Sequence, residues 1–124
     1  MALADPSREP ATVEAAAAAR AWLKLADDRE YGSTYDRADD LFHETTTRDS
    51  WIQKLTTVRT PLGARKSLDL NTATYTTTVP GGPDGRYVLL AFASSFENKA
   101  KAVETLTFHE AEPGLWRLSG YFIK

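Results

Sequence analysis

The sequence predicts an α+β fold in which three N-terminal helices pack on a strongly curved, four-stranded antiparallel sheet. Two observations support this prediction. The spacing of apolar residues changes from three and four to two near Arg65, and turn-forming clusters divide the second half into four segments. Helices followed by a run of strands are typical of an α+β layout. We expect a flexible lead-in over residues 1–10 and one domain over residues 11–124.

The first two helices are predicted from apolar stripes at helical spacing. The first runs from 11 to 29, with Thr12 as its expected N-cap and an alanine run that has the highest helix propensity. Its stripe ends in Trp22 and Leu25. The second runs from 31 to 42, with Tyr31, Tyr35, Ala38 and Phe42 on one face.

The third helix is predicted from its boundaries. Thr46 and Asp49 have the spacing of a capping box, so we expect a helix from there to about Thr60. Trp51 and Leu55 lie on its apolar face. The helix should end before Pro61, because proline disfavours helical geometry in the preceding residue.

Four strands follow, with alternating or doubly apolar patterns rich in β-branched residues. A change of phase near Thr72 predicts a β-bulge that bends the first strand. Threonine rows in the first and third strands suit a solvated sheet face or a polar surface for homodimerisation. The expected strands cover about 65–79, 87–96, 102–109 and 115–123.

Composition and motifs exclude several kinds of function. The net charge of −2 argues against nucleic acid, which requires a basic face. The chain has no cysteine and no apolar run long enough to span a membrane. His43 and His109 lack a second ligand at metal-binding spacing, and no nucleophile elbow or phosphate loop is present. We therefore expect no metal, no cofactor and no catalytic motif.

A concave interior between helices and sheet should be lined by aromatic residues. Arg59 is expected on the last turn of the third helix, where it could cap free carbonyls or pair with a carboxylate such as Glu104. Alternatively, it could hold an anionic ligand. The structural role is the favoured interpretation of Arg59. The candidate pocket-lining residues are Trp22, Tyr35, Trp51, Arg59, Phe92, Trp116 and Tyr121.

Five segments of the chain form a specific set of motifs. They are Ala21-Trp22-Leu23, Val58-Arg59-Thr60-Pro61-Leu62-Gly63, Pro80-Gly81-Gly82-Pro83-Asp84-Gly85, Ser94-Ser95-Phe96-Glu97-Asn98-Lys99 and Trp116-Arg117-Leu118-Ser119-Gly120-Tyr121. Together they resemble an uncharacterised bacterial family, the domain of unknown function numbered four thousand and nineteen. The resemblance covers nearly all of residues 12–124. It implies a nuclear-transport-factor-like or cystatin-like cone and a secreted or periplasmic protein, and it carries no catalytic residues.

The N-terminus is consistent with export. Ala2-Leu3-Ala4 has the small-x-small form that precedes a signal-peptidase cleavage site. The expected location is the periplasm or the outside of the cell after removal of a signal peptide, and the alternative is the cytoplasm.

The leading functional hypothesis is a non-enzymatic cell-envelope protein that binds a partner protein or a small apolar ligand, with homodimerisation through the sheet. One alternative is a small lyase or isomerase that uses Tyr35 or Tyr121 with Asp36 or Asp39. These aspartates lie beside the apolar stripe, so we expect them to face solvent. Another alternative is a purely structural accessory subunit with a large apolar surface patch.

Overall fold

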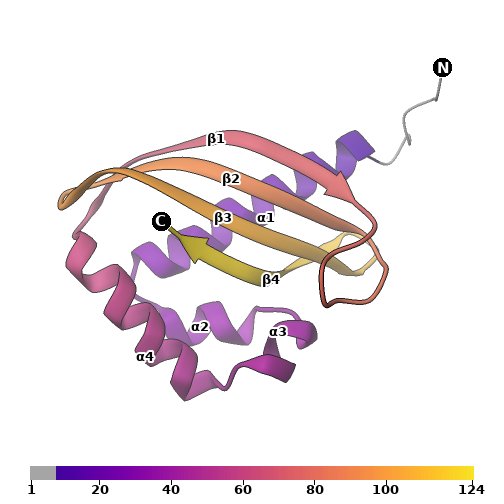
Figure 1. The fold of residues 1–124 in the computed structure, drawn as a ribbon, viewed down its shortest axis with the longest axis horizontal. Helices are drawn as coiled ribbons and strands as arrows, with labels where there is room; N and C mark the ends of the chain where they lie inside the picture. Colours follow the sequence, from indigo (N-terminus) through magenta and orange to yellow (C-terminus); the bar gives the residue numbers. More distant parts are fainter. Residues whose placement is uncertain (1–7) are drawn as a thin grey trace.

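Four α-helices precede the sheet in a computed structural model that describes residues 8–124. The predicted leader motif and residues 1–7 of the expected lead-in lie outside this range. Residues 8–10 are helical rather than part of a lead-in. The helices are α1 (Arg8–Asp27), α2 (Tyr31–Asp36), α3 (Asp40–Thr45) and α4 (Arg48–Arg59), followed by a short 3-10 turn, η1 (Thr60–Leu62) (Figure 1).

The four strands form one antiparallel meander in the order β1-β2-β3-β4. All neighbouring strands are therefore adjacent in sequence as well as in space (Figure 1). The α+β class and the four-stranded sheet are confirmed. The strands are β1 (Arg65–Thr76), β2 (Tyr87–Phe96), β3 (Lys99–Glu112) and β4 (Leu115–Ile123).

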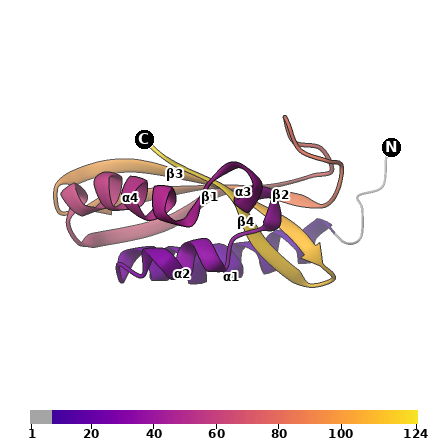
Figure 2. The same cartoon turned by 90° about the horizontal axis from the view of Figure 1, so that it is seen from below.

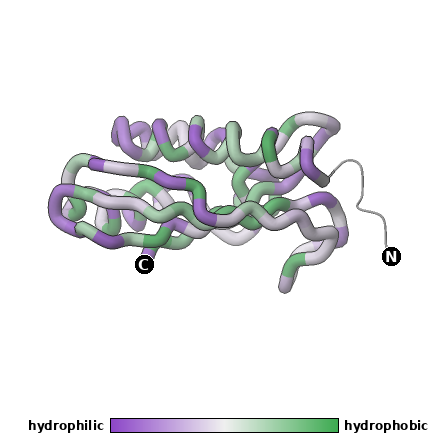
Figure 3. Tube along the Cα trace, turned by 90° about the horizontal axis from the view of Figure 1, so that it is seen from above, coloured by the Kyte–Doolittle hydropathy of each residue, from purple (hydrophilic) through white to green (hydrophobic). Residues whose placement is uncertain are grey.

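The sheet has one covered face and one face without helices. The long helix α1 runs across the inner face, with α2 in the same layer, and no helix of residues 8–124 covers the outer face (Figures 2 and 3). Burial follows this arrangement, because Val88, Leu90 and Phe92 of β2 are completely buried whereas the intervening Leu89 is exposed. Period-two alternation in strands thus defines the core of the protein.

The aromatic rings of both halves of the chain meet in this core. Trp22, Trp51 and Trp116 belong to one apolar cluster. The Trp22 ring lies 4.9 Å from that of Tyr121 and 6.4 Å from that of Trp51, measured between centroids. These rings pack against one another, so they fill much of the interior that the sequence suggested would be hollow.

The predicted second helix is in fact two short helices, α2 and α3. The chain is extended between them, where Ala38 forms a bridge with Leu118 of β4 and the Asp39 amide donates to the Leu118 carbonyl at 2.7 Å. This pairing with β4 takes the backbone out of helical geometry. The apolar stripe from Tyr31 to Phe42 nevertheless remains buried or half-buried.

Both predicted N-caps are wrong. Helix α1 already includes Arg8, so Thr12 lies inside it and donates its hydroxyl to the Glu9 carbonyl. Thr47 rather than Thr46 caps α4, and its side chain accepts a hydrogen bond from the Ser50 amide. Adjacent threonines offer the same hydroxyl, so the local sequence did not distinguish them.

The observed strand bounds agree closely with those predicted from the sequence, except in β3. That strand begins at Lys99 and ends at Glu112, because a turn at 97–98 closes the β2–β3 hairpin directly. The predicted bulge in β1 is present, one or two residues earlier, between Leu70 and Thr72. Thr72, Thr74 and Thr105 are exposed, as expected for residues on a bare sheet face.

Candidate functional site

A cluster of charged side chains is buried at the end of the sheet where α1 and α4 both terminate. At its centre is Glu104 of β3, which is completely buried. Its carboxylate accepts hydrogen bonds from Arg59 at 2.7 Å and Tyr121 at 2.5 Å on one oxygen. The other oxygen accepts from Ser94 at 2.6 Å and contacts Arg65 at 2.8 Å. Four donors therefore satisfy the carboxylate.

Asp27 completes this charge cluster by bridging the two arginines. Its carboxylate accepts one hydrogen bond from Arg59 and a bidentate pair of hydrogen bonds from Arg65, at 2.8 and 3.2 Å. Both guanidinium groups also lie over the ring of Phe96, 5.1 and 4.7 Å from its centroid. We define the charge cluster as Asp27, Arg59, Arg65, Ser94, Glu104 and Tyr121.

Interactions within the charge cluster affect the pKa values of Arg59 and Tyr121. Burial by itself would lower the pKa of Arg59, but Tyr121, Glu104 and Asp27 outweigh it and raise that pKa. Burial, assisted by the charge of Glu104, raises the pKa of Tyr121 far above its ordinary value. The guanidinium therefore stays charged, and the phenol stays protonated at physiological pH.

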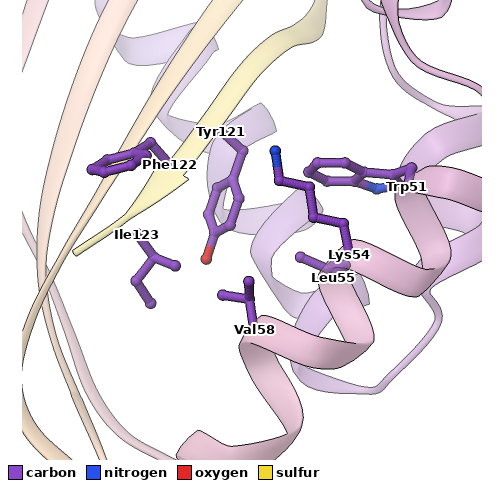
Figure 4. Close-up of a pocket in the computed structure, with 7 residues that line it drawn as sticks. All are labelled: Trp51, Lys54, Leu55, Val58, Tyr121, Phe122 and Ile123. Atoms are coloured by element: carbon purple, nitrogen blue, oxygen red, sulfur yellow. The ribbon is translucent and has the colours of Figure 1, made fainter.

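An apolar cleft opens beside the charge cluster, between α4 and the end of β4. It encloses about 160 Å³. Tyr121 links the two features, because its ring lines the cleft whereas its hydroxyl belongs to the cluster. Lys54 extends its ammonium group between Trp51 and Tyr121 (Figure 4). The lining residues of this α4–β4 cleft are Trp51, Lys54, Leu55, Val58, Tyr121, Phe122 and Ile123.

The seven residues proposed to line one pocket lie in different parts of the structure. Trp51 and Tyr121 line the α4–β4 cleft, whereas Trp22 and Trp116 border a groove between α1 and β4. Phe92 is wholly buried. The remaining two have structural partners: the Tyr35 hydroxyl donates to the Thr46 carbonyl, and Arg59 pairs with Glu104, as its favoured interpretation expected.

Neither aspartate of the catalytic alternative touches a tyrosine hydroxyl in the contacts of residues 8–124. Asp36 is half-exposed and pairs with Arg48. Asp39 is buried, contrary to the expectation that it faces solvent, and one of its oxygens lies 2.9 Å from Nδ1 of His109. It is buried because the bridge to β4 draws the backbone around it against the sheet. His109 is also largely covered, by Asp39 and by the stacked ring of Tyr87.

Sequence reasoning missed half of the charge cluster, namely Asp27, Arg65 and Ser94, and it missed the rim of the cleft. Asp27 lies in the helical half and Arg65 lies where the strand spacing begins, and neither position shows a local signal for membership of a charge cluster. One signal was present: Glu104 lies on the same strand face as Ala102, Leu106 and Phe108, so its side chain had to point into the core.

Two negative findings apply to the described part of the chain. Within residues 8–124 there is no group of three or more acidic or histidine side chains arranged to hold a metal ion. None of the described helices has both the length and the hydropathy needed to cross a bilayer.

Comparison with known proteins identifies one family. A family model described as "Protein of unknown function (DUF4019)" matches residues 18–121. This range includes the entire charge cluster and five of the seven residues that line the α4–β4 cleft. No curated protein and no solved structure matches the chain.

Proposed function

The chain belongs to the DUF4019 family of proteins of unknown function, and we propose that it is a non-catalytic binding protein whose α4–β4 cleft receives an apolar group. The apolar lining of the cleft is the observation that carries this proposal. A cleft with apolar walls and few polar groups is the usual form of a binding site. Lys54 at the rim suits a ligand or partner in which a negative charge adjoins the apolar group.

The charge cluster supports a structural role for Tyr121. A general acid or base must exchange a proton with a substrate, and its pKa should lie near the working pH. The Tyr121 hydroxyl already donates to Glu104 and accepts from Arg59 at 3.1 Å, and its pKa is raised by burial. Tyr121 and Glu104 thus resemble the alternative lyase site in composition, but the hydroxyl already donates and accepts a hydrogen bond, and four donors occupy the carboxylate. We propose that they fix one wall of the cleft.

Substitution in the cleft should weaken the binding of an apolar anion. The probe is 8-anilinonaphthalene-1-sulfonate, whose rings and sulfonate match the apolar walls and Lys54. Val58→Glu places a carboxylate in the cleft, and we expect binding to weaken at least ~10-fold, about 1.4 kcal/mol. Titration followed by energy transfer from tryptophan to the probe measures this change.

A matched control for this experiment lies one residue away. Thr57 is exposed on the same helix and does not line the cleft, so Thr57→Glu adds the same charge at a different face. Its affinity for the probe should equal that of the unaltered protein. Equal affinities for Val58→Glu and the unaltered protein would contradict the proposed site. Far-UV circular dichroism establishes that both variants are folded.

We also propose that the bare outer face of the sheet forms a homodimer. Leu89, Val103 and Phe122 are all exposed on this face, with fractional exposures of 37%, 47% and 63%. Neighbouring threonines add a flat polar border. Val103→Arg should convert the dimer to monomer in sedimentation velocity experiments, whereas Val13→Arg, an exposed position on α1, should leave it dimeric. A monomeric unaltered protein at ~50 μM, a concentration well above the Kd of a stable dimer, would exclude this proposal.

The proposed location is the cell envelope. The proposed fold type is a cone of the cystatin-like or nuclear-transport-factor-like kind. The support is the small-x-small motif at Ala2-Leu3-Ala4 and the helix layer packed on one face of a curved sheet. Determination of the mature N-terminus in fractionated cells tests the location. A cytoplasmic form that retains residues 1–4 would exclude export.

A further inference from the structure

The last residues of β4 have backbone groups that do not pair within the sheet. Val103 and Lys124 exchange both of their backbone hydrogen bonds, at 3.2 and 3.0 Å. Hydrogen-bonded and non-hydrogen-bonded pairs alternate along an antiparallel ladder. Since Lys124 is in a hydrogen-bonded pair, Ile123 and Tyr121 are in the non-hydrogen-bonded pairs, opposite Glu104 and Leu106. Their N–H and C=O groups therefore point away from β3, and no other described backbone group bonds them.

This free edge is limited to one end of β4. Further back along the strand, the carbonyl of Leu118 is occupied by the amide of Asp39. The unoccupied part runs over residues 121–123, and the same residues line the α4–β4 cleft. Four free backbone groups and an apolar cleft are thus combined at one place. Residues 121–123 lie opposite α4 across this cleft (Figure 4).

The opposite edge of the sheet is built differently. Strand β1 has two register irregularities, between Arg65 and Ser67 and between Leu70 and Thr72, and it exposes the charged side chain of Asp69. Bulges and charges of this kind protect sheet edges from pairing with other chains. The edge of β4 at 121–123 has neither feature, so the two edges of one sheet differ in their readiness to accept a strand.

The volume of the cleft suits one apolar side chain, or one ring of a larger molecule whose other atoms stay outside. Pockets for small molecules usually enclose roughly 300–1,000 Å³, and the α4–β4 cleft encloses about 160 Å³. In strand addition, the main chain of an extended peptide bonds the sheet edge while alternate side chains enter pockets. The cleft follows the edge of β4, and its lining includes Tyr121 and Ile123, whose side chains lie on one strand face. Every second side chain of an added strand would point to that face.

We propose that an extended segment of a partner protein adds to β4 as a fifth, antiparallel strand and inserts an apolar side chain into the α4–β4 cleft. The inference rests on the proposed function of this cleft and specifies the chemistry of its ligand. The segment has apolar residues at alternate positions and an acidic residue near one end. That acidic residue pairs with Lys54, which forms no salt bridge within residues 8–124.

The probe for this proposal is the hexapeptide acetyl-Asp-Val-Thr-Val-Thr-Val-amide. In an antiparallel pair, the residue opposite Tyr121 points to the same face and exchanges both backbone bonds with it. The valines therefore enter the cleft and also present their amides to β4. One derivative carries N-methyl groups on the three valine amides, and a second carries them on the Asp and Thr amides.

Isothermal titration should distinguish these peptides. We expect the derivative methylated on Asp and Thr to bind within about threefold of the parent peptide, and the derivative methylated on valine to bind at least tenfold more weakly. A parent peptide with Lys in place of Asp should also bind more weakly at low salt. Equal affinities for the two methylated derivatives would overturn strand addition.

Backbone substitution in the protein gives an independent test. Ile123→Pro removes an N–H that faces the free edge and does not serve the β3 ladder, a position where proline is tolerated. The peptide should bind at least tenfold more weakly to Ile123→Pro than to Ile123→Val, which keeps the N–H. Equal peptide binding by these two variants would overturn the proposal.

Failure of strand addition can be separated from failure of the proposed function. If the cleft binds 8-anilinonaphthalene-1-sulfonate, with the loss expected in Val58→Glu, but binds none of the peptides, strand addition is wrong and the apolar binding site stands. If neither the probe nor the peptides bind, both proposals are wrong.

Discussion

Replacement of Glu104 by glutamine is expected to lower the free energy of unfolding by about 3–5 kcal/mol. The carboxylate is completely buried between Arg59 and Arg65, with Tyr121 and Ser94 as its further donors. The amide of glutamine has nearly the same shape but carries no charge, and its NH₂ group faces donors instead of acceptors. Two buried guanidinium groups then share only Asp27 as a negative partner. Urea denaturation measures the change.

A surface ion pair is the control for this substitution. Asp36 and Arg48 form a bond of 2.9 Å, similar to those of the charge cluster, but both side chains are about half exposed. Exposed pairs contribute little because water screens them. Asp36→Asn should therefore leave the urea midpoint almost unchanged. If Glu104→Gln shifted the midpoint no more than Asp36→Asn does, the charge cluster would not stabilise the fold as we describe.

Truncation of Trp22 to alanine is expected to destabilise the protein by about 3–5 kcal/mol, the usual cost of removing a buried aromatic side chain. Trp22 is buried beneath Trp51 and Tyr121. Its indole N–H donates to the carbonyl of Thr34 at 3.1 Å. Trp22→Ala thus opens a cavity and also leaves a buried carbonyl without a partner.

One further substitution separates the contribution of the Trp22 ring from that of its hydrogen bond, and a second serves as a control. Trp22→Phe keeps an aromatic ring but removes the hydrogen bond, so its destabilisation should be intermediate. Val13→Ala changes an exposed residue of the same helix and should alter stability by less than about 0.5 kcal/mol. Thermal and urea unfolding provide the three values. A loss for Trp22→Ala as small as that for Val13→Ala would show that the rings do not form the common core.

Most of the fold could be predicted because its signals are local. The change of spacing near Arg65 and the bounds of β2 and β4 follow from alternation and turn residues. The break between α2 and α3 could not be predicted, because it depends on the bridge between Ala38 and Leu118, which are far apart in the sequence. The apolar stripe continued across the break and therefore suggested one continuous helix.

The candidate site was predicted only in part for the same reason. Trp51 and Tyr121 were expected to line a pocket, and both line the cleft. The pairing of Arg59 with Glu104 was predicted because Arg59 lies on the last turn of a helix, where a carboxylate can bind its guanidinium group. Asp27 and Arg65 joined this pair only through the packing of α1 against β1, which no local pattern specifies.

The unequal edges of the sheet limit how far any assembly can grow. A β-sheet whose two borders both accepted strands could extend without end, copy after copy, as in fibrils. Here the β1 edge has bulges that disfavour pairing with another strand, and among the two sheet edges of residues 8–124 the short stretch at 121–123 is the one with unpaired backbone groups and no bulge. Under the proposed strand addition, a copy of this chain that used its own 121–123 edge for pairing would have no second edge of this kind, so growth from copy to copy should stop. Complexes made through this border should therefore contain a fixed number of these chains.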